Sequence, residues 1–322
     1  MRKRSVVLST RGCCPWLVVQ PRLLSRVSAP GCSAWGRRLV LLLPAQSAIG
    51  GRSPASHQPD TTSSPGARGG TCKLWVVPLR HHVLLCELHA HTAFSDGDLS
   101  LRETVDVYGL AGFDVLCITD HCVRADDPWL ETASRPNHVQ AANFDRYLQA
   151  VEREADRARA RFDMLVVPGL ELTYWHHDPR FAAHAVAVGL RSFVGVEEGV
   201  EKALVDARAA GAALIAAHPY RLEDAQRNER GTARFAVEWP SLHRLVDRFE
   251  LANRHELFPW VARAKLPYVA SGDFHRPEHL NTWKTLVPCA KSEAALVSYL
   301  RSPTPVHITR LAAEGPLGQM AA

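Results

Sequence analysis

Short apolar runs alternate with helical segments through most of this chain, and this alternation constrains the fold more than any other feature of the sequence. The runs are nearly continuous in apolar residues, which is typical of parallel strands that are covered on both faces. We predict strands at 83–88, 114–119, 164–172, 182–189, 212–217, 248–252 and 268–271.

Helical patterns fall between most of these strands. Ser100 and Glu103 form a capping box that starts a helix, and this helix ends near Gly112. Apolar residues from Phe144 to Phe162 recur at alternating spacings of four and three, which places them on one face of a long helix. We predict helices at 100–112, 139–162, 197–210, 240–247, 257–265 and 292–301.

Seven strand-then-helix units in one continuous domain predict an α/β fold, in the form of a distorted, closed (β/α)7 barrel of the TIM type. Catalytic residues of such barrels gather at the C-terminal ends of the strands. An open, doubly wound sheet is the alternative. No GxGxxG or Walker A motif follows a strand, so a nucleotide cradle is not indicated. The stretch 123–137 is predicted as a loop over the active face.

Charge is divided unevenly along the 322 residues, although the net charge of +5 at first suggests a nucleic-acid partner. Residues 1–70 hold ten Lys/Arg and one acidic residue, whereas 71–322 hold 28 Lys/Arg and 32 acidic residues. The positive charge therefore belongs to the N-terminal segment, and the sequence does not support nucleic-acid binding by the folded domain.

We place the domain at 76–322 and interpret 1–75 as a disordered N-terminal extension. A transit-like targeting peptide and a poor signal peptide around 37–50 are the alternatives. The apolar stretch 39–44 is too short to cross a bilayer, so no membrane partner is expected. Eight cysteines without a CxxC pair indicate a reducing compartment, and we expect a cytoplasmic location. The sequence leaves the oligomeric state open.

Histidines and acidic residues stand at the ends of most predicted strands. In the first strand, His89 and His91 lie on the same face of an extended segment, so both side chains can reach one ion. Imidazole and carboxylate together suit Zn, Mn or Fe. The candidate metal ligands are His89, His91, Asp96, His121, Glu171, His184, His218, Asp273 and His275.

Nine candidate ligands are too many for one ion, so we predict two or three divalent transition-metal ions. Glu171 is the candidate bridge between ions, because a carboxylate has two oxygens. Clustered ions clamp a phosphoryl group and generate hydroxide near neutral pH. His184 lies inside an apolar run, and for this residue a hydrogen-bonded core histidine is the alternative.

The ordered motifs resemble those of the polymerase and histidinol phosphatase (PHP) family, over roughly residues 83–290. The matching motifs are HAH at 89–91, SDG at 95–97, TDH at 119–121, PGLE at 168–171, His184, AHP at 217–219 and DFH at 273–275. The resemblance implies a distorted seven-stranded barrel, a trinuclear metal site and phosphoester hydrolysis. The implied ion sites are His89, His91, Glu171 and Asp273 for the first, Glu171, His184 and His218 for the second, and Asp96, His121 and His275 for the third.

Two departures from the family pattern bear on the site and its substrate. Gly272 stands where many members have Ser, and we expect little effect because Asp273 and His275 remain. Only 33 residues separate His184 and His218, so the helical insertion of the family's nucleoside bisphosphate phosphatases is missing. A small phosphorylated molecule or a short nucleotide is the expected substrate.

Candidate substrate residues follow the same strand ends. Arg221 and Arg276 would project from the rim, where a guanidinium suits a phosphate. Asn253 is expected to orient the substrate or a ligand. Asp120 is the candidate catalytic carboxylate, and it would hold His121 or a metal-bound water; a metal-bound hydroxide is the alternative catalyst. The HHD run at 176–178 is either a local polar turn or a substrate contact.

These features predict a metal-dependent phosphoesterase that acts on a phosphate monoester or diester. A metal-dependent amidohydrolase is the first alternative, although no lysine stands at a predicted strand end to bridge its ions. A metal-binding barrel that is catalytically silent and serves as a regulatory module is the second.

Overall fold

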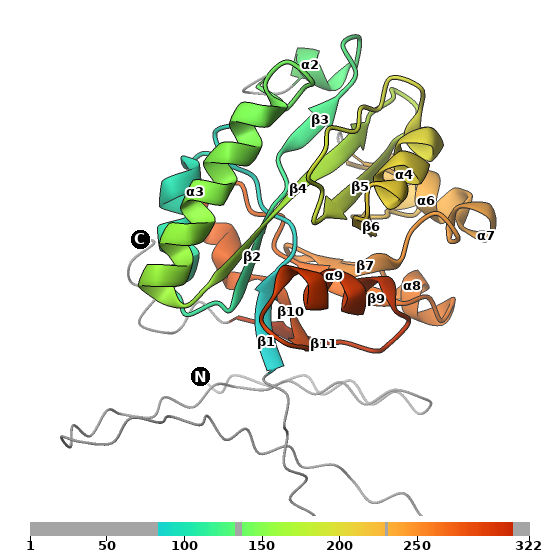
Figure 1. Cartoon of the computed structure of the whole chain (residues 1–322). Helices are drawn as coiled ribbons and strands as arrows, with labels where there is room; N and C mark the ends of the chain where they lie inside the picture. The colour runs from blue at the N-terminus through green and yellow to red at the C-terminus, as the bar shows by residue number, and fades with distance from the viewer. Residues whose placement is uncertain (1–82, 133–136, 229–230, 312–322) are drawn as a thin grey trace, which may run out of the picture. The chain divides into compact units, whose positions relative to one another are not determined.

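The computed structural model describes residues 83–132, 137–228 and 231–311 (Figure 1). The predicted extension at 1–75 lies outside these residues. The strands are β1 Val83–Glu87, β2 Val115–Ile118, β3 His121–Val123, β4 Leu165–Tyr174, β5 Ala183–Val188, β6 Ala213–Ala217, β7 Arg248–Asn253, β8 Glu256–Leu257, β9 Tyr268–Ser271, β10 Trp283–Pro288 and β11 His307–Arg310. The α-helices are α1 Leu101–Leu110, α2 Trp129–Thr132, α3 Phe144–Phe162, α4 Val200–Ala209, α5 Leu222–Ala225, α6 Arg234–Val237, α7 Trp239–Leu242, α8 Pro259–Arg263 and α9 Glu293–Arg301.

The strands form one curled sheet in the order β11-β10-β1-β2-β4-β5-β6-β7-β8, with β3 paired to β4 and β9 paired to β7. β1, β2 and β4 are parallel neighbours, as are β6, β7 and β9. The segments that follow β1 and β9 lie side by side, and the His91 N–H donates to the Phe274 carbonyl over 2.8 Å. The α/β class and the barrel-like curl are confirmed, whereas a regular (β/α)7 count is not.

The strand predicted at 182–189 runs in the opposite direction to the others. β5 is antiparallel to both β4 and β6, so the parallel prediction for this strand is wrong. The described segment 175–182 between β4 and β5 contains no helix and is too short for a parallel crossover, which needs about ten residues or more. The N-terminal end of β5 therefore lies at the rim, and His184 stands opposite Thr173 and Ala217.

Helices α1 and α3 lie where the sequence predicts helices. Ser100 and Glu103 form the expected capping box at the start of α1. α3 ends at Asp163, whose left-handed backbone (φ 52°) closes the last turn. Figure 1 shows α3 along β4 and α4 beside β5 and β6. The predicted helix at 240–247 shrinks to α7, and strands β10 and β11 were not predicted.

Two apolar clusters cover the two faces of the sheet. One lies between the strands and helices α1, α3 and α4. The other contains Val167 of β4, Val186 of β5 and, from α9, Leu296 and Leu300. Because side chains alternate along a strand, Val167 shares its face with Glu171, so this second cluster lies on the face that carries the bridge candidate. Among the described residues, no helix is long and apolar enough to cross a membrane.

Candidate metal centre

All nine predicted ligands lie together at one rim of the sheet. His89 and His91 follow β1, and Asp273 and His275 follow β9 at the closure between these strands. Glu171 belongs to β4, and His184 reaches the rim from the start of β5 because that strand is reversed. The remaining members are Asp96 in the turn after His91, His121 at the start of β3 and His218 just after β6.

A first group of ligand atoms surrounds one oxygen of Glu171. The Nε2 atoms of His89 and His91 each lie 3.3 Å from Glu171 Oε2. The same two nitrogens lie 3.6 Å and 3.4 Å from Asp273 Oδ1. Two ligands that bind one ion at about 2.1 Å in tetrahedral geometry lie about 3.4 Å apart, so these separations suit a shared ion.

The other oxygen of Glu171 faces a second pair of histidines. Glu171 Oε1 lies 3.2 Å from His184 Nδ1 and 3.1 Å from His218 Nε2. The single carboxylate therefore presents one oxygen to each of two histidine pairs. This is the arrangement that a carboxylate bridging two ions requires.

A third group forms around Asp96. Its Oδ1 lies 3.5 Å from His121 Nε2 and 3.1 Å from His275 Nε2. His121 also brings its Nδ1 within 3.0 Å of Glu171 Oε2, and His91 Nδ1 lies 3.9 Å from Asp96 Oδ1. The three groups therefore adjoin one another.

Five buried polar atoms of this cluster have no hydrogen-bond partner among the described residues. Such atoms are rare in folded proteins, because each loses its hydration without compensation. They are His89 Nε2, His91 Nε2, Asp96 Oδ1, Glu171 Oε2 and His184 Nε2. All five belong to candidate ligands, so the residues present fit a cluster of divalent metal ions.

The buried carboxylates of the cluster are held in their charged form. Burial alone would raise the pKa of Glu171, but His89 and His121 lower it well below its usual range. Burial is likewise outweighed at Asp273, where Arg254 and His89 lower the pKa. His91 shows the opposite response: burial lowers its pKa, but Asp273 and Glu171 raise it to about 9. The carboxylates of the site are therefore ionised and lie directly beside the histidines.

Polar residues behind the ligands orient the imidazole rings. Glu250 Oε1 lies 3.0 Å from His89 Nδ1, which leaves Nε2 directed at the other ligands. Glu250 Oε2 also accepts the backbone N–H of His218 over 2.6 Å and a side-chain N–H of Asn253 over 2.7 Å. Asn253 is thus buried beside the site and lines its cavity. Sequence reasoning missed Glu250, although an acid inside the apolar run of β7 was the available signal.

Asp120 lies beneath the site. Its Oδ1 accepts the Thr92 N–H over 2.8 Å and the Ser95 hydroxyl over 2.6 Å, and its Oδ2 accepts the Thr92 hydroxyl over 2.9 Å. It is fully buried and does not line the cavity described below. These hydrogen bonds fix the turn between His91 and Asp96, and the catalytic role of Asp120 stays a prediction.

The arginine that approaches the ligands is Arg254, which sequence reasoning missed. Its Nη2 lies 3.1 Å from Asp273 Oδ2 and 2.8 Å from His275 Nδ1, and its Nε donates to the Asp273 carbonyl over 3.0 Å. The left-handed backbone of Arg254 (φ 48°) follows β7 directly. The expected arginines Arg221 and Arg276 are exposed and do not line the cavity.

A cavity of about 270 Å³ opens onto the ligands. Arg254 is the one Arg or Lys among the described residues that line it. The residues around it are Asp96, His121, Trp129, Glu171, Trp175, His184, His218, Tyr220, Asn228, Asn253, Arg254, His255, Glu256, Asp273 and His275. The 176–178 run stays outside this set, and the Asp178 N–H donates to His176 Nδ1 over 2.9 Å in a local polar turn.

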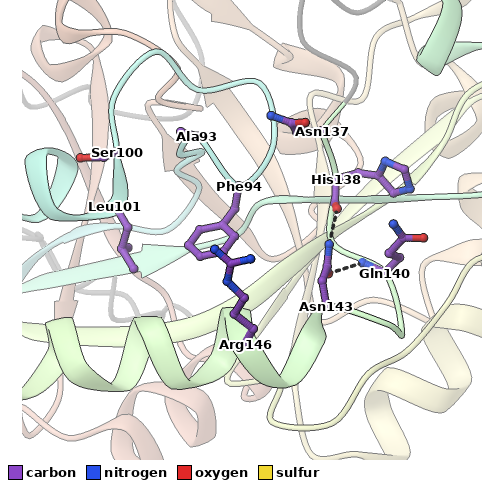
Figure 2. A pocket seen from close by; sticks show the side chains of 9 residues that line it. All are labelled: Ala93, Phe94, Ser100, Leu101, Asn137, His138, Gln140, Asn143 and Arg146. Atoms are coloured by element: carbon purple, nitrogen blue, oxygen red, sulfur yellow. Dashed lines mark hydrogen bonds between the residues drawn. The ribbon is translucent and has the colours of Figure 1, made fainter.

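A second hollow, of about 480 Å³, contains none of the nine ligands. Figure 2 shows Arg146 extending from α3 toward Phe94, with Asn143 hydrogen-bonded to the backbone of His138 and Gln140. Its arginine therefore offers a matched comparison for Arg254 of the ligand cavity.

Comparison with protein families gives a match to the PHP domain over residues 87–258, which is more than half of the chain. The chain belongs to the PHP family. The matched range contains seven of the nine ligand candidates, and Asp273 and His275 lie beyond it. No curated protein matches the chain.

Solved structures with a similar fold include a two-domain protein from Bacteroides vulgatus that contains a predicted PHP-like metal-dependent phosphoesterase. That protein is 19% identical with a TM-score of 0.51, and the match covers 72% of this chain and 66% of the other. This chain thus spans just under two thirds of that protein. A candidate metal-dependent phosphoesterase from Bifidobacterium adolescentis is 16% identical, with a TM-score of 0.39 and coverage of 59% and 87%. An amidohydrolase from Chromobacterium violaceum is 13% identical, with a TM-score of 0.38 and the same coverage of 59% and 87%.

The departure from the PHP pattern at Gly272 is explained by a buried ion pair. Lys284 Nζ lies 2.9 Å from Glu87 Oε2, and both side chains are fully buried. A Cβ at Gly272 would lie 2.3 Å from Lys284 Nζ and 2.4 Å from Glu87 Oε2. Glu87 Oε1 also accepts the N–H groups of Gly272 over 2.8 Å and of His89 over 3.3 Å. Glu87 thus joins the segments that carry His89 and Asp273, and its ion pair with Lys284 occupies the place where a serine side chain would otherwise stand.

Gly272→Ala should lower the free energy of unfolding by about 1–3 kcal/mol, because the added methyl group displaces the buried pair. In a background that carries both Glu87→Ala and Lys284→Ala the same change should cost clearly less, since both close atoms are gone. Denaturant unfolding measures both values. Gly195→Ala is the matched control, because a Cβ there makes only ordinary contacts with Phe193. Equal costs in the two backgrounds would contradict the steric explanation.

Proposed function

We propose that this protein is a metal-dependent phosphoesterase that hydrolyses a phosphate monoester or diester with two or three divalent ions. The observation that carries the proposal is the placement of Glu171, whose two oxygens each face a separate pair of histidines. Membership of the PHP family and the unpartnered ligand atoms support it.

Three groups of residues would hold the ions. The first is His89, His91, Glu171 and Asp273, the second is Glu171, His184 and His218, and the third is Asp96, His121 and His275. When bound, ions of the Mn, Zn or Fe type supply positive charge to a phosphoryl group and lower the pKa of water.

Arg254 is the proposed contact for the phosphoryl group. Its Nε and Nη2 bind Asp273 and His275, and among the described residues no partner of Nη1 is found. A guanidinium fixed on one side in this way keeps its remaining donors oriented for a phosphate oxygen. Asn253 is held by Glu250 at the same wall and orients the substrate, while Asp120 keeps the ligand turn in place.

Water or an acidic group at the cavity rim would protonate the leaving oxygen. No lysine lines the cavity among the described residues, although the amidohydrolase alternative calls for a lysine or an equivalent bridge. Glu171 would itself be such an equivalent bridge, so the proposal of phosphoester chemistry rests on the match to the PHP domain.

Purified full-length protein loaded with Mn²⁺ should hydrolyse members of a panel of phosphate esters, releasing phosphate from monoesters or an alcohol and a monoester from diesters, and a chelator should abolish this hydrolysis. The panel includes amides and lactones, so that hydrolysis of these compounds alone would point to the amidohydrolase alternative. Full metal occupancy without any turnover would instead indicate the catalytically silent module and overturn the proposal.

Arg254→Gln should lower kcat/KM by about ten- to a hundredfold, which is the effect of losing a charged hydrogen bond of about 1.5–3 kcal/mol. Arg146→Gln is the matched control, because Arg146 lines the second hollow and is exposed. Steady-state kinetics and metal content are measured for both variants. An unchanged kcat/KM in Arg254→Gln would remove this residue from the phosphate site.

A further inference from the structure

Two tryptophans line the cavity that opens onto the metal ligands. Trp129 is buried on α2, and its ring lies 4.7 Å from the ring of His121. Trp175 follows β4 directly and is partly exposed. Tyr220, which follows β6, lines the same cavity. The mouth of an otherwise charged site is therefore aromatic.

One buried carboxylate fixes both tryptophans. Asp127 is 1% exposed; its Oδ1 accepts the Trp129 N–H over 2.9 Å and its Oδ2 accepts the Trp175 N–H over 3.1 Å. Both are backbone N–H groups, and Trp175 lies 48 residues after Asp127 in the sequence. Asp127 thus joins the loop before α2 to the end of β4.

Arg124 completes this anchor. Its Nη2 donates to the Trp175 carbonyl over 3.2 Å and lies 3.3 Å from Asp127 Oδ2. Its guanidinium stacks over the Tyr174 ring at 4.0 Å. Because burial of an unpaired carboxylate is costly, this cation makes the position of Asp127 favourable. The Trp175 backbone is therefore held at both its N–H and its carbonyl.

The cavity also continues into an adjoining hollow of about 630 Å³. Tyr220, Asn228 and Glu256 line both spaces. A phosphoryl group at the ligands would leave the rest of the ester near the aromatic mouth, with room to extend beyond it.

We propose that Trp175, positioned by Asp127, selects phosphoesters whose leaving group carries a planar ring. This inference rests on the proposed phosphoesterase function and adds the substrate class. Flat rings gain from offset or edge-to-face contact with an indole beyond the effect of buried area. Asp127 is a positioning residue here, because it acts through the two tryptophans and not on the substrate.

The test compares 2-phenylethyl phosphate with 2-cyclohexylethyl phosphate, which share the reacting bond and differ in the flat ring. The wild-type protein should show a kcat/KM about two- to tenfold higher for the phenyl ester. Trp175→Leu should bring this ratio close to one. A ratio near one in the wild type, or a ratio that Trp175→Leu leaves unchanged, would overturn the inference.

The corresponding phosphonates, which cannot be hydrolysed, separate this inference from the proposed function. Calorimetry on the Mn²⁺-loaded protein should show the same two- to tenfold preference for the phenyl compound. A preference in binding, with no turnover of either ester or of any member of the phosphoester panel, would uphold the aromatic site and overturn the phosphoesterase. Turnover of both esters at equal efficiency would uphold the phosphoesterase and overturn the aromatic site.

Asp127→Asn tests the positioning role, with the neighbouring Asp126→Asn as control because Asp126 is 86% exposed. Asp127→Asn should raise KM for the phenyl ester and lower the phenyl-to-cyclohexyl ratio, whereas Asp126→Asn should leave the ratio as in the wild type. An equal fall in kcat for both esters with an unchanged ratio would show a merely structural effect and contradict the role.

Discussion

The rest of the site depends on one buried carboxylate that has histidines at both of its oxygens. Glu171 is 1% exposed, and isolated burial of its charge would be strongly unfavourable. The surrounding histidines keep it ionised, and they come from strands on both sides of β4. A fold that brings these residues to one edge therefore creates a place where positive charge is required. Divalent ions would meet that requirement and would give the unpartnered ligand atoms a partner.

The strand positions could be predicted because they depend on apolar content alone. All seven predicted runs contain a strand of the structure. The direction of β5 could not, because it depends on the length of the loop after β4 and not on its own residues. That reversal is also what carries His184 to the rim. β10 and β11 were missed because charged residues such as Lys284 and Arg310 interrupt their apolar residues, although Lys284 is itself fully buried.

Most ligands were predictable because they stand at or just after a strand end in a recognisable motif, whereas His184 lies inside an apolar run. The structure brings all nine together. Their supporting residues were harder to find. Arg254, Glu250 and Lys284 act through contacts between segments far apart in the sequence, which spacing does not reveal. The hydrogen bonds of Asp120 to Thr92 and Ser95 were likewise not evident from its motif, and its catalytic role stays a prediction.

The central claim is that Glu171 joins neighbouring ions, and a count of bound metal tests it most directly. Elemental analysis of the full chain, reconstituted with Mn²⁺, Zn²⁺ or Fe²⁺ and then desalted, is compared between wild type and Glu171→Gln. The exposed Glu152→Gln serves as control. Two or three ions per wild-type chain, falling to at most one in Glu171→Gln, is the predicted result. No retained ion in the wild type, or equal metal content in both proteins, would contradict the account.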